Sequence, residues 1–174
     1  SFVYSATLSA EDVQIRPPTT LPEQLKLDGL GEVQCTTCHE PHDNQYGNFL
    51  VMPNNRSRMC VSCHGLSGWA LSAHESSTAL ASVANDSYLQ NNEYDTVVEN
   101  SCVSCHRPHS AGGHERLLHF SRLEDNCLNC HDGSVAKTNL KSEITKFSRH
   151  DVGRYEDIHD LKESPSTSIR HVEC

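Results

Sequence analysis

The chain has 174 residues, of which 36% are hydrophobic and 6% aromatic, and its formal net charge is −9 at pH 7. This low content of apolar side chains can fill only a small protein interior. We therefore expect a bound cofactor to contribute to the core. The negative charge argues against nucleic acid as a partner, because nucleic acid selects a basic surface. A membrane span requires about 18 consecutive apolar residues. No segment of the chain has such a run, so no span is expected.

In chain order, the predicted regular structure is sparse. Residues 1–34 contain the Pro-rich stretch "RPPTTLPEQ" and neither histidine nor cysteine, and we expect a loop there. A short helix is expected at each of four cysteine motifs, one helix across about residues 70–90 and another near 140–148. The expected fold class is mostly irregular, with short α-helices and little or no sheet.

Eight of the nine cysteines belong to four CxxCH motifs, in which a histidine directly follows the second cysteine. A zinc ribbon requires only the CxxC pairs, and a disulfide framework requires neither the spacing nor the histidine, so both leave the histidines unexplained. The pattern is typical of c-type haem attachment. The motifs are Cys35-Thr-Thr-Cys38-His39, Cys60-Val-Ser-Cys63-His64, Cys102-Val-Ser-Cys105-His106 and Cys127-Leu-Asn-Cys130-His131.

On a short helix, the two cysteines and the histidine of such a motif share one face. The two thiols can therefore form thioethers with the haem vinyl groups while the imidazole binds the iron. We expect four covalent haem c groups, which form the core that the side chains do not provide. Attachment of this kind is made outside the cytoplasmic membrane, which indicates the periplasm or the cell surface. The predicted iron ligands are His39, His64, His106 and His131.

The second axial ligand of each iron decides between electron transfer and catalysis. An iron with two strong ligands gains and loses electrons, whereas an open sixth position can activate a small molecule. The chain has only two methionines, Met52 and Met59, so methionine ligation cannot be general. The candidate histidines for the four positions are His42, His74, His109, His114, His119, His150, His159 and His171.

His42 and His109 occur in the same phrase, CHxPH, three residues after a predicted iron ligand. Three residues span at most roughly 10 Å, too little to reach the opposite face of the same haem. The intervening proline also prevents the helix from continuing. We therefore assign His42 to the haem of the second motif and His109 to the haem of the fourth, which links the haems in pairs.

His74 in "LSAHES" and His150 in "FSRHDVG" are also expected to be distal ligands. His74 precedes the third motif and is assigned to its haem. The alternative for each is an ordinary surface histidine, and this alternative is favoured for the remaining four candidates.

The four motifs form an internal repeat. The step from Cys35 to Cys102 and the step from Cys60 to Cys127 are both 67 residues, which indicates a duplicated two-haem unit. A gap-free alignment places Leu50 opposite Leu117. The expected organisation is a haem-free lead segment at 1–34, a first two-haem unit with linker at 35–99, a second unit at 100–150 and a tail at 151–174.

In this gap-free alignment, His119 falls opposite Met52, so the repeat does not support His119 as a ligand. The haem of the first motif has no histidine upstream in the chain. Its sixth ligand is expected to fold back from downstream, to come from another chain or a missing upstream segment, or to be absent.

The stretches "CTTCHEPHDNQYGNFLVM", "CVSCHRPHSAGGHERLLH" and "FSRHDVG" resemble the multihaem c-type cytochromes with doubled CxxCH motifs, and the resemblance covers about residues 35–174. It implies bis-histidine low-spin haems packed in near contact, with His42, His74, His109 and His150 as distal ligands. It also implies electron transfer in the periplasm or outside the cell. Some members are subunits of extracellular filaments in which one subunit donates a histidine to the next.

We therefore expect a tetrahaem electron-transfer protein that is not an enzyme, with other redox proteins as its electron donors and acceptors. One alternative is the subunit of an extracellular cytochrome filament with a shared ligand. The other is a multihaem reductase with one open haem, for which the haem of the first motif is the candidate.

The ninth cysteine, Cys174, ends the chain in "SIRHVEC". In the family, CxxCHxPH units usually continue, often with "HVxCxxCHxPH". Cys174 is therefore expected to be the first cysteine of a truncated third unit, which leaves His150 and His171 available to the haem of the first motif.

Overall fold

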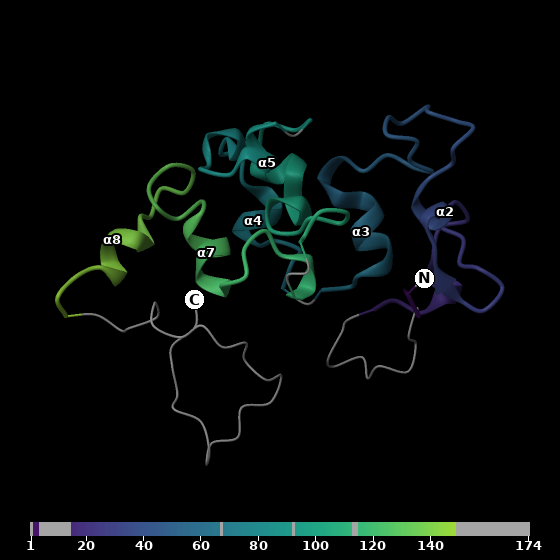
Figure 1. Ribbon diagram of the computed structural model, residues 1–174, viewed down its shortest axis with the longest axis horizontal. Helices are drawn as coiled ribbons and strands as arrows, with labels where there is room; N and C mark the ends of the chain where they lie inside the picture. Colours follow the sequence, from purple (N-terminus) through teal and green to yellow (C-terminus); the bar gives the residue numbers. More distant parts are fainter. Residues whose placement is uncertain (1, 4–14, 67, 92, 113–114, 149–174) are drawn as a thin grey trace, which may run out of the picture. The chain divides into compact units, whose positions relative to one another are not determined.

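The computed structural model describes residues 2–3, 15–66, 68–91, 93–112 and 115–148. Its helices are short and are separated by irregular segments (Figure 1). The α-helices are α2 (Cys35–Cys38), α3 (Arg58–Cys63), α4 (Ala73–Ser76), α5 (Ser87–Gln90), α6 (Val97–Asn100), α7 (Leu123–Leu128) and α8 (Leu140–Ile144). The 3-10 helices are η1 (Pro18–Thr20), η2 (Asn55–Ser57), η3 (Ala81–Val83), η4 (Ser101–Ser104) and η5 (Glu115–Leu117).

Sheet structure is nearly absent from the described part of the chain. Strands β1 (Phe2–Val3) and β2 (Glu32–Val33) form an antiparallel pair in which Phe2 lies opposite Val33. The other pairings are isolated bridges. The predicted fold class, mostly irregular with short helices and essentially no sheet, is confirmed.

Side chains at the N-termini start several of these helices. Ser72 Oγ accepts the Glu75 N–H at 3.0 Å, Asp86 Oδ1 accepts the Tyr88 N–H at 2.8 Å, and Asn139 Oδ1 accepts the Ser142 N–H at 2.9 Å. Isolated helices shorter than about 12 residues are marginal in water. These helices therefore depend on contacts beyond their own hydrogen bonds.

The predicted helix across residues 70–90 is wrong, because the structure divides this region into α4, η3 and α5. Between α4 and η3 the backbone is extended and pairs with a later segment. Leu80 forms a bridge with Thr96, and the Val97 N–H donates to the Ala79 carbonyl at 2.9 Å. These long-range bonds replace the local helical bonds. The helix predicted near 140–148 is confirmed as α8.

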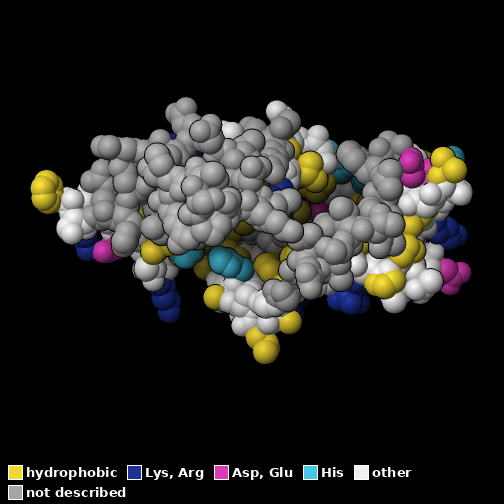
Figure 2. All heavy atoms as spheres, turned by 90° about the horizontal axis from the view of Figure 1, so that it is seen from below, with side chains coloured by type: hydrophobic (Ala, Val, Ile, Leu, Met, Phe, Trp, Pro, Cys, Tyr) yellow, Lys and Arg dark blue, Asp and Glu magenta, His cyan; other side chains and the backbone are white. Residues whose placement is uncertain are grey.

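The side-chain core is small. Several of its buried apolar residues are alanines, such as Ala81 and Ala84, whereas Leu71 is 97% exposed and Phe147 fully exposed. Hydrophobic side chains are accordingly visible on the surface of the described residues (Figure 2). The chain divides into two compact units, Ser1–Ser77 with Val98–Cys102, and Thr78–Val97 with Val103–Cys174. Among the residues that the structure describes, neither unit has the large apolar interior of an ordinary domain.

Candidate haem-binding sites

Three of the four CxxCH motifs begin in an α-helical turn that ends at the histidine. The histidine N–H donates to the carbonyl of the first cysteine in each, from His39 to Cys35 at 2.9 Å, from His64 to Cys60 at 2.9 Å and from His131 to Cys127 at 3.0 Å. The third motif begins instead in the 3-10 helix η4, which ends at Ser104, before Cys105 and His106. The helical turn predicted at each motif is therefore confirmed, as a 3-10 turn at the third motif and as an α-helical turn at the other three.

The cysteines of the motifs are not engaged in the two alternatives to haem. Among the described residues, none of the eight forms a disulfide, and no group of three or more His, Cys, Asp and Glu side chains is arranged to hold a metal ion. The eight sulfurs are therefore compatible with thioether bonds to haem vinyl groups.

A second segment of the chain returns to each motif, and we call it the return segment. Its backbone N–H donates to the carbonyl of the second cysteine of the motif, and this contact occurs at all four motifs. The bonds run from Val51 to Cys38 at 3.0 Å, from Arg16 to Cys63 at 2.8 Å, from His119 to Cys105 at 3.1 Å and from Ala136 to Cys130 at 2.9 Å.

Three proximal histidines also bond a backbone carbonyl through Nδ1. The acceptors are Asn48 for His39 at 2.9 Å, Arg116 for His106 at 2.7 Å and Thr138 for His131 at 3.3 Å. A carbonyl only accepts hydrogen bonds, so Nδ1 carries the proton and Nε2 keeps the lone pair that binds iron. This outer hydrogen bond is typical of histidine ligands to metals, so these histidines fit a haem iron.

The return segments of the first and third motifs are built in the same unusual way. Asn48 and Phe49 have φ of 50° and 55°, and Arg116 and Leu117 have φ of 53° and 59°. This left-handed conformation costs roughly 1–2 kcal/mol per ordinary residue. In each pair, this conformation lets the carbonyl of the first residue accept the hydrogen bond from the histidine of the motif. The carbonyl of the second residue accepts a backbone N–H at 2.7 Å, from Glu40 to Phe49 and from Arg107 to Leu117.

These contacts correct the gap-free alignment of the repeat. His39 forms a bridge with Leu50, and His106 forms the same bridge with Leu118, not with Leu117. The return segments of the first and third motifs are therefore 68 residues apart in the chain, whereas the motifs themselves are 67 residues apart. His119 corresponds to Val51 instead of Met52. The second unit has one additional residue before its return segment and one fewer after it.

The lead segment also reaches a haem motif, which the sequence reasoning missed. Ile15 forms a bridge with His64, the Arg16 N–H donates to Cys63, and Arg16 Nε donates to the Val61 carbonyl at 3.0 Å. The second motif therefore takes its return segment from residues 15–16. No motif in the sequence marks this contact.

The second motif lies beside the first cysteine of the third. The buried Ser57 hydroxyl donates to the Asn100 carbonyl and accepts the Cys102 N–H, both at 2.9 Å. The Cys60 and Cys102 thiols hydrogen-bond one another. This bond and burial raise the pKa of Cys60, whereas the same bond lowers the pKa of Cys102 against the opposing effect of burial. In the haem-loaded protein these sulfurs are thioethers, so two attachment points lie side by side.

The structure places the remaining histidines differently. His42, His74 and His109 are exposed, with His42 and His109 in turns after their prolines and His74 in α4. His119 is buried and bonds the Asp86 carboxylate and the Val103 carbonyl, so it is not available as a distal ligand. The ligand assignments themselves stay predictions. His114, His150, His159, His171 and Cys174 lie outside the described residues.

Two buried polar atoms near the third motif further fit a haem. Ser104 Oγ and Arg107 Nε have no hydrogen-bond partner within the described part of the chain. Buried donors are rarely left unpaired. A haem carries two carboxylates, which are suitable acceptors for both donors.

Comparison with known proteins identifies a family. The family model described as the doubled CXXCH motif matches residues 29–67 and 95–136, which contain all four motifs. No curated protein and no solved structure matches the chain. None of the helices in the described residues is long and apolar enough to cross a membrane. The chain belongs to the doubled CXXCH motif family and is a multihaem c-type cytochrome that carries covalent haem c on its CxxCH motifs.

Proposed function

We propose that this cytochrome transfers electrons through four haems, each attached to one CxxCH motif and bound by a histidine on both faces. The observation that supports this proposal best is the contact between Cys60 and Cys102. It brings together the attachment points of the second and third haems, which belong to different repeats. Two porphyrins that start from neighbouring sulfurs lie at the short range that electron transfer requires.

The proposed ligands extend this pair into a chain of four haems. His42 would connect the first motif to the second haem, and His109 the third motif to the fourth. His74 and His150 are the proposed distal ligands of the two other haems. A histidine on both faces leaves no position for substrate, so the proposed protein has no reaction of its own and exchanges electrons with other redox proteins.

The proposed location is the periplasm or the outside of the cell, because c-type cytochromes typically lie outside the cytoplasm. A filament subunit with a shared ligand uses the same chemistry. It is favoured by the absence of histidine from residues 1–34, upstream of the first motif. The reductase alternative requires an open iron at that same first haem.

Mass and spectra of the haem-loaded protein test the proposal. Intact mass should show four haems, and the reduced absorption spectrum should be low-spin and unchanged by carbon monoxide. Fewer than four haems would contradict the tetrahaem assignment. A high-spin signal from one haem in four, with a spectral change in carbon monoxide, would favour the reductase. Electron micrographs of the purified protein separate a filament from a single particle.

A further inference from the structure

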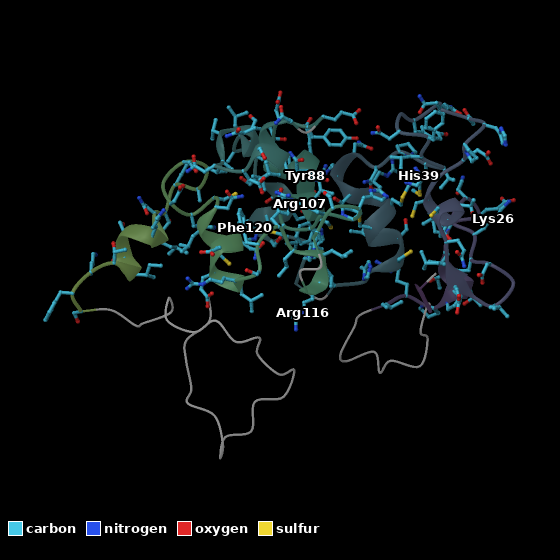
Figure 3. The ribbon with its side chains drawn as sticks, viewed as in Figure 1. Lys26, His39, Tyr88, Arg107, Arg116 and Phe120 are labelled. Atoms are coloured by element: carbon cyan, nitrogen blue, oxygen red, sulfur yellow. The ribbon has the colours of Figure 1, made fainter. Side chains whose placement is uncertain are left out.

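A buried group of charged side chains lies next to the third motif, and we call it the Asp86 cluster. It consists of Asp86, Tyr88, Arg107 and His119. The Asp86 and His119 side chains are 2% and 1% exposed, and the Arg107 side chain is 23% exposed. The Arg107 guanidinium carbon lies 4.9 Å from the centre of the Tyr88 ring (Figure 3). The His119 ring meets the same Tyr88 ring edge-on, with the two ring centres 5.1 Å apart.

The hydrogen bonds define the charge of this cluster. Asp86 Oδ1 accepts from Arg107 at 2.7 Å and from the Tyr88 N–H at 2.8 Å, and Oδ2 accepts from His119. Burial opposes ionisation, but these bonds outweigh it and hold the pKa of Asp86 below its ordinary value. Asp86 is therefore a carboxylate.

Both ring nitrogens of His119 face hydrogen-bond acceptors. Its Nδ1 faces the Asp86 carboxylate, and its Nε2 lies 3.0 Å from the Val103 carbonyl. Neither group can donate a hydrogen, so both ring nitrogens must. With Arg107 and His119 positive and Asp86 negative, the cluster carries one excess positive charge.

The His119 imidazole contacts the backbone of the third motif directly. Val103, which accepts from His119, lies between the two cysteines of that motif. The His119 backbone N–H donates to the Cys105 carbonyl, and Arg107 directly follows His106. The Asp86 charge also acts on the fourth motif, because burial, Asp132 and then Asp86 raise the pKa of Cys130.

We propose that His119, within the Asp86 cluster, raises the reduction potential of the haem attached to Cys102 and Cys105. This inference rests on the proposed function, since it requires a redox-active haem at the third motif. A haem that gains an electron becomes more negative by one charge, and a fixed positive charge nearby stabilises that reduced form. His119 acts through its field and through Val103, so it is a positioning residue and not an iron ligand.

If one unit charge lies about 10 Å from a haem and the effective dielectric constant between them is about 20, the charge changes the reduction equilibrium constant of that haem by about tenfold. Replacing His119 with neutral glutamine should therefore lower the reduction equilibrium constant of the third haem about tenfold, which is about 59 mV for one electron. The other haems should shift less.

The experiment uses the full haem-loaded chain and a redox titration followed by NMR of the haem methyl groups, which resolves each haem. The variants are His119→Gln, Arg107→Gln and the control Lys146→Gln, which removes one positive charge from a side chain that is 57% exposed. The expected result is a lower potential of the third haem in the first two variants and less than a twofold change in the control. Arg107→Gln decides the question if His119→Gln does not fold.

Unchanged potentials in both variants would overturn the proposal, as would equal shifts in all four haems or an equal shift in the control. If four redox-active haems are present and only the shift is missing, this inference fails while the proposed function stands. If the third haem is absent or does not titrate, the proposed function itself fails.

Discussion

The first and third motifs share one backbone construction but place it in different surroundings. Val51 and His119 occupy the same position, and each donates its N–H to the second cysteine of its motif. Phe49 and Leu117, two residues earlier, are both 48% exposed. At the third motif, however, the return segment brings in a buried imidazole that bonds the Asp86 carboxylate. Duplication therefore kept the backbone that holds the histidine, while a side chain outside the CxxCH motif makes the two sites electrically different.

Removing the thioethers should have the largest effect and should be equal at the two motifs. The double variants Cys35→Ala/Cys38→Ala and Cys102→Ala/Cys105→Ala should each lose one haem by intact mass. Because the haem replaces core side chains, the free energy of unfolding should fall by about 3–5 kcal/mol, as for deletion of a large buried side chain. A double variant that retains its full haem mass would show that its motif does not attach haem.

The next prediction uses the pH dependence of stability to test the Asp86 cluster, which distinguishes the third motif from the first. Asp86→Asn breaks a buried ion pair and should destabilise the protein by about 3–5 kcal/mol at pH 7. The folded pKa of Asp86 is lowered, so its contribution is present above the unfolded pKa of about 3.9 and is lost as the pH falls through the folded pKa.

Denaturant unfolding of the wild type and Asp86→Asn at several pH values tests this sign. The difference between the two proteins should be constant from pH 7 to about 5 and should shrink below about pH 4. A difference that grows in acid would contradict the ionised carboxylate. Asp43→Asn, at an exposed position near the first motif, is the control.

A third difference is that Ser57 anchors the first cysteine of the third motif. Ser57→Ala leaves the buried Cys102 N–H and Asn100 carbonyl without this partner, which should cost about 1–3 kcal/mol. The matched control is Ser62→Ala, because Ser62 donates only an exposed hydrogen bond to Arg58 within its own helix. Equal losses of unfolding free energy in both variants would argue against the anchor.

The smallest effect should come from the left-handed residues. Arg116→Gly should stabilise the third site by up to about 1 kcal/mol, because glycine adopts φ of 53° without a steric penalty. Asn48→Gly should gain less, since asparagine tolerates this conformation better than arginine. Thermal unfolding of the two variants compares the gains, and a larger gain at Asn48 would contradict this account of the strain.

The sequence by itself determined the four haem motifs, their duplication and the fold class. This was possible because the chemistry of attachment is local: five consecutive residues supply two sulfurs and one imidazole, and a short helical turn presents them together. The low apolar content likewise predicted the small side-chain core. The helix expected across residues 70–90 failed, because local propensity did not reveal the pairing of Ala79 and Leu80 with the segment near Thr96.

Only the tertiary structure decided what surrounds the motifs. The contacts Arg16–Val61 and Ser57–Cys102 each join residues 45 apart in the chain, and Asp86 and His119 are 33 apart. No local pattern encodes such pairs. Many of them use backbone carbonyls, which every residue has, so residue type gives no signal. The same reason hid the one-residue displacement of the second return segment. His119, favoured from the sequence as an ordinary surface histidine, is instead buried beside the third motif.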